Sequence, residues 1–293
     1  MKKISLFFIS MCLCLGINAQ VFEGTYKDCF SVKWAVNEDE IVAKYKASVD
    51  DNPEIPAASK AMAKMMAKPL VKNMMGKMEI ERYISQYPDG KYNCYMWVDA
   101  TNNRSVAFCP ELGRIIVRNP SEGKDRIIFP KLGIGCEYEY PASETAIKDV
   151  FTTTHIQDPK ENSKVINGVN CVPGISVFSY EQVGGELVDT ITYKGVLCVK
   201  IPANGYVHAD YQMLPIQRTT ENAFLSVTEN VRNMKDGKID TKNFVLPEDI
   251  DFKDYKKLAK EIKKIVNDGE TNEKLAIPYD GEIPALVWDI IKK

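Results

Sequence analysis

Short runs of alternating apolar and polar residues are the main pattern along this chain, and such alternation is typical of half-buried β-strands. The segment CFSVKWAV at 29–36 places Phe30, Val32 and Trp34 on one side. Further strands are expected at 79–87, 91–98, 105–109, 114–118, 126–129, 150–156, 174–180, 187–200, 211–218, 224–232 and 243–246. Turn sequences such as YPDGK, EGKD and GG separate them, so the pattern predicts a mainly β fold with some α-helix (α+β), built on a single antiparallel sheet.

One segment near the end has the period of an amphipathic α-helix instead. In DFKDYKKLAKEIKKIVND, apolar residues recur at helical spacing from Phe252 to Val266. Asp251 is a candidate N-cap and Gly269 a candidate stop. The tail at 268–293 is expected to pack back on the domain.

A second helical segment, the insert at 57–78, contains six of the chain's eleven methionines. Methionines and lysines fall on opposite sides of this helix, and Pro69 is expected to hinge it into two short pieces. Three interpretations compete: a helix packed on the core, a lid over an apolar cavity, or a helix at a membrane surface. In the cavity interpretation the wall consists of Met62, Met65, Met66, Leu70, Met74 and Met78.

The first 19 residues have the organisation of an export signal, with two lysines, an apolar run from Ile4 to Leu15, and Ala19 before the expected cleavage. The residues before Cys12 and Cys14 are larger than lipid-modifying cleavage accepts, so we expect no lipid anchor. No later segment has the length of a membrane helix. The expected location is therefore the periplasm or beyond, with one domain at 20–267 followed by the tail.

Charge and motifs argue against several classes of function. Loss of the two signal lysines lowers the basic residues from 38 to 36 against 40 acidic ones, a net charge of −4 that gives no reason to expect nucleic-acid binding. His155 and His208 are the only histidines, and neither belongs to a triad or a metal-binding spacing. The acidic groups at 38–40 and 50–54 lack a calcium-loop pattern and are expected in solvated loops. We therefore expect no enzyme activity, no metal and no cofactor.

Cysteines give a further constraint, because an even number in an exported chain suggests disulfides. Six follow the signal: Cys29, Cys94, Cys109, Cys136, Cys171 and Cys198. The alternative is that all six are buried free thiols, which behave as small hydrophobic groups.

Two of the pairs follow from hairpin geometry. A turn at 100–103 places Cys94 opposite Cys109, and symmetry about the Gly-Gly pair at 184–185 places Cys171 opposite Cys198. Cys29 and Cys136 would then pair by exclusion.

Three short motifs support a resemblance to a known family: QVFEGTY after the signal, SKVINGVNC at 163–171 and DGKIDTKNFVLPED at 236–249. Together they resemble an exported Gram-negative family of unknown function with a LolA-like fold and, more distantly, the GLPGLI-type proteins. The resemblance covers about 21–266 and implies a strongly curved sheet, a half-barrel, with helices across its concave side. In LolA that concavity carries the acyl chains of lipoproteins. The six cysteines and the tail depart from the family pattern, so a shared ligand does not follow.

Two hypotheses of function result. The first is a periplasmic protein that binds or carries a lipid or a lipoprotein acyl chain in the concavity, with the methionine wall as its lining. The second is a disulfide-braced envelope module with a filled core that binds another protein.

Overall fold

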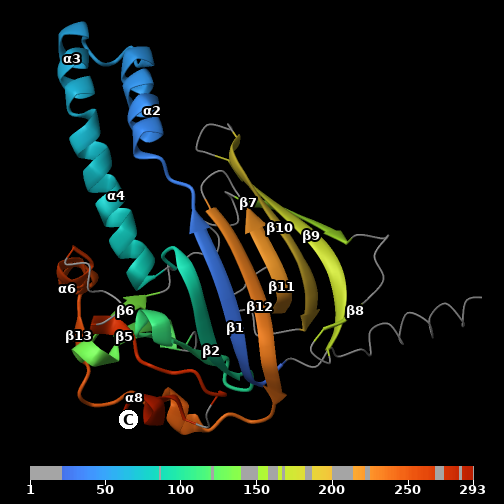
Figure 1. Cartoon of the computed structure of the whole chain (residues 1–293). Coiled ribbons are helices and arrows are strands. Elements are labelled where there is room, and N and C mark those ends of the chain that lie inside the picture. The colour runs from blue at the N-terminus through green and yellow to red at the C-terminus, as the bar shows by residue number, and fades with distance from the viewer. Residues whose placement is uncertain are drawn as a thin grey trace, which may run out of the picture.

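The computed structural model describes residues 22–85, 87–119, 122–139, 151–157, 164–166, 169–181, 187–199, 214–221, 225–267, 274–283 and 286–292. The predicted signal, His208 and the Gly-Gly turn at 184–185 lie outside these residues. Figure 1 shows one large sheet with helices beside it, which is the predicted α+β class.

Thirteen strands make up the described part of the sheet. They are β1 (Gly24–Trp34), β2 (Gly90–Asp99), β3 (Arg104–Cys109), β4 (Arg114–Asn119), β5 (Lys124–Phe129), β6 (Ile134–Glu139), β7 (Phe151–Gln157), β8 (Lys164–Ile166), β9 (Val169–Glu181), β10 (Leu187–Val199), β11 (Leu214–Glu221), β12 (Leu225–Asp236) and β13 (Asp251–Lys253). The helices are α2 (Glu38–Asp51), α3 (Ala57–Met65), α4 (Ala67–Ile84), α6 (Tyr255–Asn267) and α8 (Val287–Ile291).

Neighbouring strands in the sheet follow the order β13-β6-β5-β4-β3-β2-β1-β12-β11-β10-β9-β7, and β8 pairs with β9. The described strands therefore form an open sheet. Among them every pairing is antiparallel except β13 with β6, which is parallel. The prediction of a purely antiparallel sheet is thus wrong at one edge. The parallel strand there, β13, has only three residues, and a strand this short shows no alternating pattern in the sequence.

The β2–β3 hairpin illustrates how local sequence sets the register. Asn103 has a φ of 54° and its N–H donates to the carbonyl of Ala100 at 3.3 Å, which closes the predicted turn. The carboxylate of Asp99 accepts from Asn102 and, at 2.8 Å, from Nε of Arg104. Burial acts to raise the pKa of Asp99, but these hydrogen bonds outweigh it and hold that pKa below its usual value.

Strands β2 to β5 contribute buried side chains to both faces of the sheet. On one face Cys94 and Met96 of β2 belong to a core that Ile84 of α4 and Leu258 of α6 complete. On the other face Trp97 belongs to a second core, which the tail covers. This two-sided burial explains why β2 reads as a nearly continuous apolar run.

The tail covers the second core with Ile277, Ile283, Val287 and Trp288. Its approach is close, because the N–H of Ile277 donates to the carbonyl of Pro110 at 2.8 Å. Residues 274–283 and 286–292 therefore complete the burial of β2 to β5 on the face opposite α6.

The connections β3–β4 and β5–β6 share a motif that sequence analysis missed. Each is a 3-10 turn with the pattern P-x-L-G, at 110–113 and 130–133. Gly113 and Gly133 end the turns with φ of 57° and 61°, a left-handed conformation that glycine adopts most easily.

Several predicted elements differ from the structure. The predicted strand at 79–87 is largely the end of α4, because Ile80 and Ile84 bury one helical face although the letters also alternate. The predicted strand at 243–246 falls partly on a 3-10 helix, η4 (Thr241–Phe244). The predicted terminal helix begins at Tyr255 rather than after Asp251, and the Asp254 carboxylate accepts from the N–H of Lys257 at 2.9 Å. The acidic groups at 38–40 and at 50–51, predicted in solvated loops, lie instead in helix α2.

Candidate functional site

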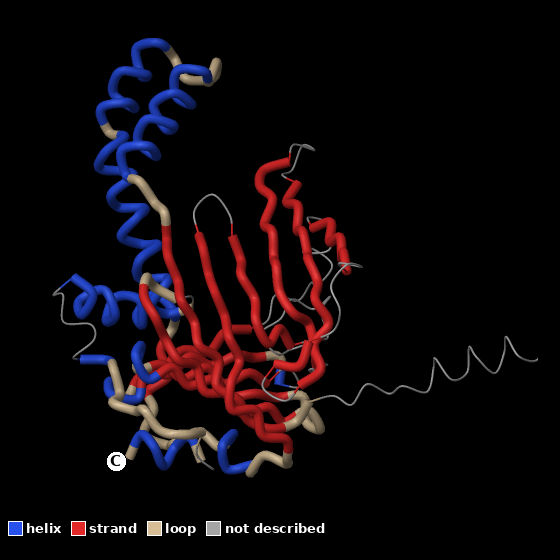
Figure 2. Tube along the Cα trace, turned by 45° about the vertical axis from the view of Figure 1, so that its right-hand side comes forward, coloured by secondary structure: helices blue, strands red, loops and turns tan. Residues whose placement is uncertain are grey.

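Helices α2, α3 and α4 form an arm, residues 38–84, that projects beyond the strands (Figures 1 and 2). The arm has a small core of its own, in which Val42 of α2 packs with Ala67 and Val71 of α4. The end of α4 joins the sheet's core, beside α6. Helix α6 and the end of α4 therefore pack on the core of the sheet, whereas the insert at 57–78 does not pack across the sheet as predicted.

Helix α2 explains the lysine side of the insert. Asn37 caps α2 by accepting from the N–H of Asp39 at 3.0 Å, and three acidic residues follow in the first turn, where they complement the helix dipole. At the other end, Lys64 forms an ion pair with Asp50 at 2.6 Å, and Lys60 donates to the Asp50 carbonyl at 2.5 Å. The lysines at this end of the insert therefore face α2 and connect the helices of the arm.

All six apolar residues assigned to the cavity wall are exposed. The exposed fractions are 67% for Met62, 71% for Met65, 42% for Met66, 45% for Leu70, 43% for Met74 and 36% for Met78. Their places in the arm's core are taken by Ala67 and Val71, which lie between them in the sequence. The six side chains are thus neither core nor an enclosed lining in the structure.

The helix breaks at Met66 rather than at Pro69. Met66 has φ −79° and ψ −5°, and its N–H donates to the carbonyl of Met62 at 3.0 Å. Pro69 occupies the first turn of α4, where a missing N–H breaks no helical hydrogen bond. A proline ring clashes with the carbonyl four residues earlier, which here is that of Met65, the last residue of α3.

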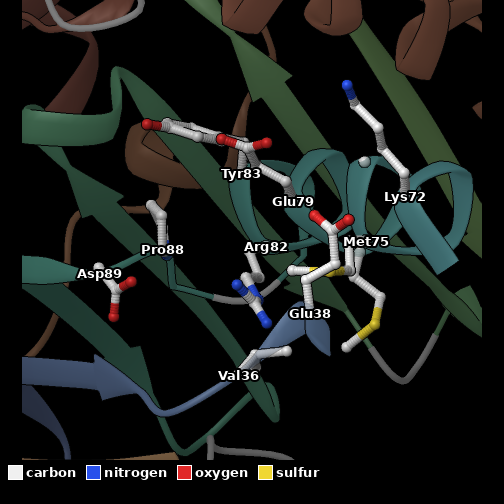
Figure 3. Close-up of a pocket in the computed structure, with 11 residues that line it drawn as sticks. Val36, Glu38, Lys72, Met75, Glu79, Arg82, Tyr83, Pro88 and Asp89 are labelled. Atoms are coloured by element: carbon white, nitrogen blue, oxygen red, sulfur yellow. The ribbon is translucent and has the colours of Figure 1, made fainter. Parts of the chain in front are cut away.

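A pocket of about 450 Å³ lies where the arm joins the sheet (Figure 3). Its lining comes from the start of α2, one face of α4 and the loop before β2, and consists of Val36, Glu38, Lys72, Met75, Gly76, Met78, Glu79, Arg82, Tyr83, Pro88 and Asp89. Of the six predicted wall residues, Met78 alone lines it. The pocket is open and mixes both signs of charge with apolar surface, so it is a poor enclosure for an acyl chain.

Arg82 of this pocket packs against an aromatic side chain of β1. Its guanidinium lies 4.0 Å from the ring of Trp34, and the indole N–H of Trp34 donates to the carbonyl of Tyr87 at 2.9 Å. Burial lowers the pKa of Arg82, while Asp89 and Glu79 act to raise it. The contact fixes the base of α4 against β1, and no pattern in the sequence indicates it.

Two predicted cysteine registers agree with the strand pairing. Tyr95 pairs with Phe108, which places Cys94 opposite Cys109, and Val172 pairs with Leu197, which places Cys171 opposite Cys198. Cys94 and Cys109 are buried and remain free thiols in the structure.

Cys29 and Cys136 are not brought together. Cys29 lies on β1 and Cys136 on β6, and four strands separate β1 from β6 in the sheet. Both are in the thiol form. The prediction of this pair by exclusion was wrong because it did not consider the strand order.

Burial strongly affects the thiols of the β2–β3 pair. It raises the pKa of Cys94 to about 12 and raises that of Cys109 well above its usual value. The Cys94 sulfur also lies 3.6 Å from the sulfur of Met96.

Comparison with known proteins adds no family to this description. No protein-family model matches the chain, and no curated protein matches it. Within the described ranges, no cluster of three or more His, Cys, Asp or Glu side chains is arranged to hold a metal ion. The helices in these ranges include none with the length and apolarity needed to cross a membrane.

Proposed function

We propose that this protein is a non-enzymatic, exported binding protein, and that its arm engages an amphipathic helix of a partner protein. The supporting observation is the exposure of Met62, Met65, Met66, Leu70, Met74 and Met78, each at least 36% accessible on a projecting element. Soluble proteins rarely expose a contiguous apolar surface of this kind, and where they do it commonly marks an interaction site. The proposal includes a half-barrel sheet of the LolA-like kind, which the sequence motifs support.

The shape of the arm favours a helical partner. Met62, Met66, Leu70, Met74 and Met78 are spaced by four residues, and we call them the methionine row. The N–H of Leu70 donates to the carbonyl of Met66 at 3.1 Å, so the row continues across the break between α3 and α4. A row with this spacing forms the type of ridge that fits the groove of another helix. Methionine suits such a surface because it is flexible and adapts to varied apolar partners.

Charge makes a membrane surface a weaker choice of partner. Residues 38–84 contain eight acidic and eight basic side chains, so the arm has no net charge. Helices that lie on membranes usually carry an excess of lysine and arginine facing the anionic headgroups. Here Lys60 and Lys64 are instead occupied by Asp50 of α2.

The acyl-chain carrier is also less well supported. That function requires the six residues to enclose a cavity, whereas only Met78 of the six lines the pocket at the base of the arm. Both faces of β2 to β5 are filled by side chains of α4, α6 and the tail.

Site-specific photo-crosslinking in the native envelope tests the proposal. A benzophenone amino acid at Leu70 should give one discrete protein adduct, and the same group at exposed Lys46 of α2 should not. The partner so identified is then purified. Met66→Asp with Met74→Asp should weaken its binding at least about tenfold, because charges enter an apolar contact.

The matched control is Ala43→Asp with Ala47→Asp, which adds the same charge to an exposed part of α2. Equal weakening by both double variants would contradict the proposal. So would adducts at Leu70 that contain only lipid, or native mass spectra showing a bound acyl ligand.

A further inference from the structure

The methionines of the arm fall into two triplets of mirrored spacing. The first is MAKMM at 62–66 and the second is MMGKM at 74–78, with Leu70 at the midpoint. An apolar docking surface gains from the flexibility of methionine, but it does not require the methionines to be grouped in mirrored triplets. What methionine adds is a thioether sulfur, which is a soft, neutral ligand.

We propose that each triplet binds one soft monovalent cation, Cu(I) or Ag(I), through its three thioether sulfurs. The first site consists of Met62, Met65 and Met66, and the second of Met74, Met75 and Met78. Thioether ligands select such cations over zinc, calcium or magnesium, which prefer nitrogen, thiolate or oxygen ligands.

The helix geometry places the three members of each triplet within reach of one ion. Residues three or four apart on a helix have Cβ atoms about 5–6 Å apart, and each triplet covers an arc of roughly 100°. In the first triplet the hydrogen bond from Met66 to Met62 shows that this spacing holds at the break. Methionine has three rotatable side-chain bonds, so its sulfur can move toward a shared ion without moving the helix.

Both triplets are open to an incoming ion. The first is the more exposed, with Met62 at 67% and Met65 at 71%. In the second, Met75 and Met78 both line the pocket at the base of the arm, and Met75 also packs against the arm's small core. We therefore expect the first site to fill without rearrangement and the second to reduce the mobility of α4.

The test uses silver nitrate as a redox-inert probe and the mature protein labelled with ¹³C at the methionine methyl groups. Half-buried Cys29 is first replaced by serine, because its thiol would bind silver before a thioether does. Titration should then shift the six arm resonances and saturate at two equivalents. Met234 on β12 should not respond. Met96 should not respond either, and it serves as an internal control because the thiol of Cys94 lies 3.6 Å from its sulfur. A shift at Met96 would reveal binding to the buried thiols.

Isosteric variants then assign each site. Replacing Met62, Met65 and Met66 by leucine should lower the stoichiometry from two to one, and replacing all six should abolish it, with unchanged circular dichroism. Leu70→Met is the matched control, since it adds a thioether between the triplets and should leave the stoichiometry at two. Unchanged silver binding after all six replacements would overturn the proposal, as would the absence of arm shifts below about 1 mM silver.

The proposal of metal sites can be tested independently of the proposal that the arm binds a partner protein. Leucine conserves the apolar volume of methionine, so the variant with six replacements should still give the Leu70 crosslink. Loss of silver binding with retention of the crosslink supports both proposals. Silver binding without any protein crosslink supports the metal sites alone.

Discussion

The indole N–H of Trp288 donates a hydrogen bond to the backbone carbonyl of Asn243 at 2.9 Å, across 45 residues of sequence. The side chain of the same asparagine accepts from the N–H of Val287 at 2.7 Å. Helix α8 lacks a side-chain cap at Leu286, so Asn243 caps it from η4. One buried residue thus fixes the tail against the second core.

Replacing Asn243 by alanine should loosen the tail. The change leaves the N–H of Val287 without its buried acceptor, and such a loss costs about 1–3 kcal/mol. Urea unfolding followed by tryptophan fluorescence would measure the change. Asn73→Ala, at an exposed position of α4, should change the free energy of unfolding by less than about 0.5 kcal/mol. Equal effects at the two sites would contradict the role of Asn243.

Gly113 is expected to be intolerant of any side chain. A Cβ there would lie 1.7 Å from the carbonyl oxygen of Leu275, so the tail would have to move. Gly123 is a matched control, because it has a similar φ of 68° and a Cβ at that position would have no atom within 4 Å. Gly123→Ala should cost only the backbone strain, about 1–2 kcal/mol. Gly113→Ala should cost more and should also make the tail sensitive to limited proteolysis. Tail cleavage at the same rate in both variants would argue against this contact.

Asp99 should make the free energy of unfolding depend on pH in the acidic range. Its pKa is lowered in the folded protein, so the carboxylate stabilises the fold above its unfolded pKa of about 4, and this contribution is lost as pH falls through the lowered value. Asp99→Asn should therefore cost roughly 1.5–3 kcal/mol at pH 6 and much less at pH 2. Urea midpoints of both proteins across this pH range give the measurement. A difference that does not change with pH would exclude the carboxylate as the cause.

The thiols of Cys94 and Cys109 should react very slowly in the folded, reduced protein. With a pKa of about 12, Cys94 is a thiolate in roughly 1 of 10⁴ molecules at pH 8, and the thiolate is the reactive form. Half-buried Cys29 should react first with a thiol reagent, and all should react together in urea. A predicted Cys94–Cys109 disulfide would then have to form during folding, which non-reducing peptide mapping of freshly exported protein can detect. Fast native labelling of Cys94 would contradict its burial.

Sequence patterns predicted the local parts of this fold well. The register of β2 with β3 follows from a short turn, because a turn fixes which residues face each other. The register of β9 with β10 agrees with the predicted one at Val172 and Leu197, although it shifts by one residue between Leu187 and Asp189. Strand β13 was not predicted because it has only three residues and its partner, β6, lies more than 100 residues earlier in the sequence. The end of α4 was misread because MEIERYI satisfies both the strand and the helix period, and only burial of Ile80 and Ile84 decides between them.

The sequence predicted which residues form the apolar side of the insert, but it did not predict that this side is exposed to solvent. Periodicity identified Met62 to Met78 as one amphipathic element. It could not show that α2 covers the opposite side, since that depends on a second helix. The sequence did hold a signal for α2, because Asn37 followed by three acidic residues is a typical helix start. A helix predicted from that start would have offered acidic partners to the lysines of the insert. The exposure of the methionines on the opposite side would then have been the expected result.

The small core of the arm has a consequence for its motion. Val42, Ala67 and Val71 are the buried side chains of that cluster, whereas β2 to β5 are buried on both faces. Local opening of α2 and α3 therefore needs far less free energy than global unfolding, and their amides should exchange with solvent long before those of β2. A partner that binds the methionine row must also offset the entropy lost when α2 and α3 are held in their folded positions. Substitutions that stabilise the packing of α2 against α4 reduce this cost, so they should raise the partner's apparent affinity.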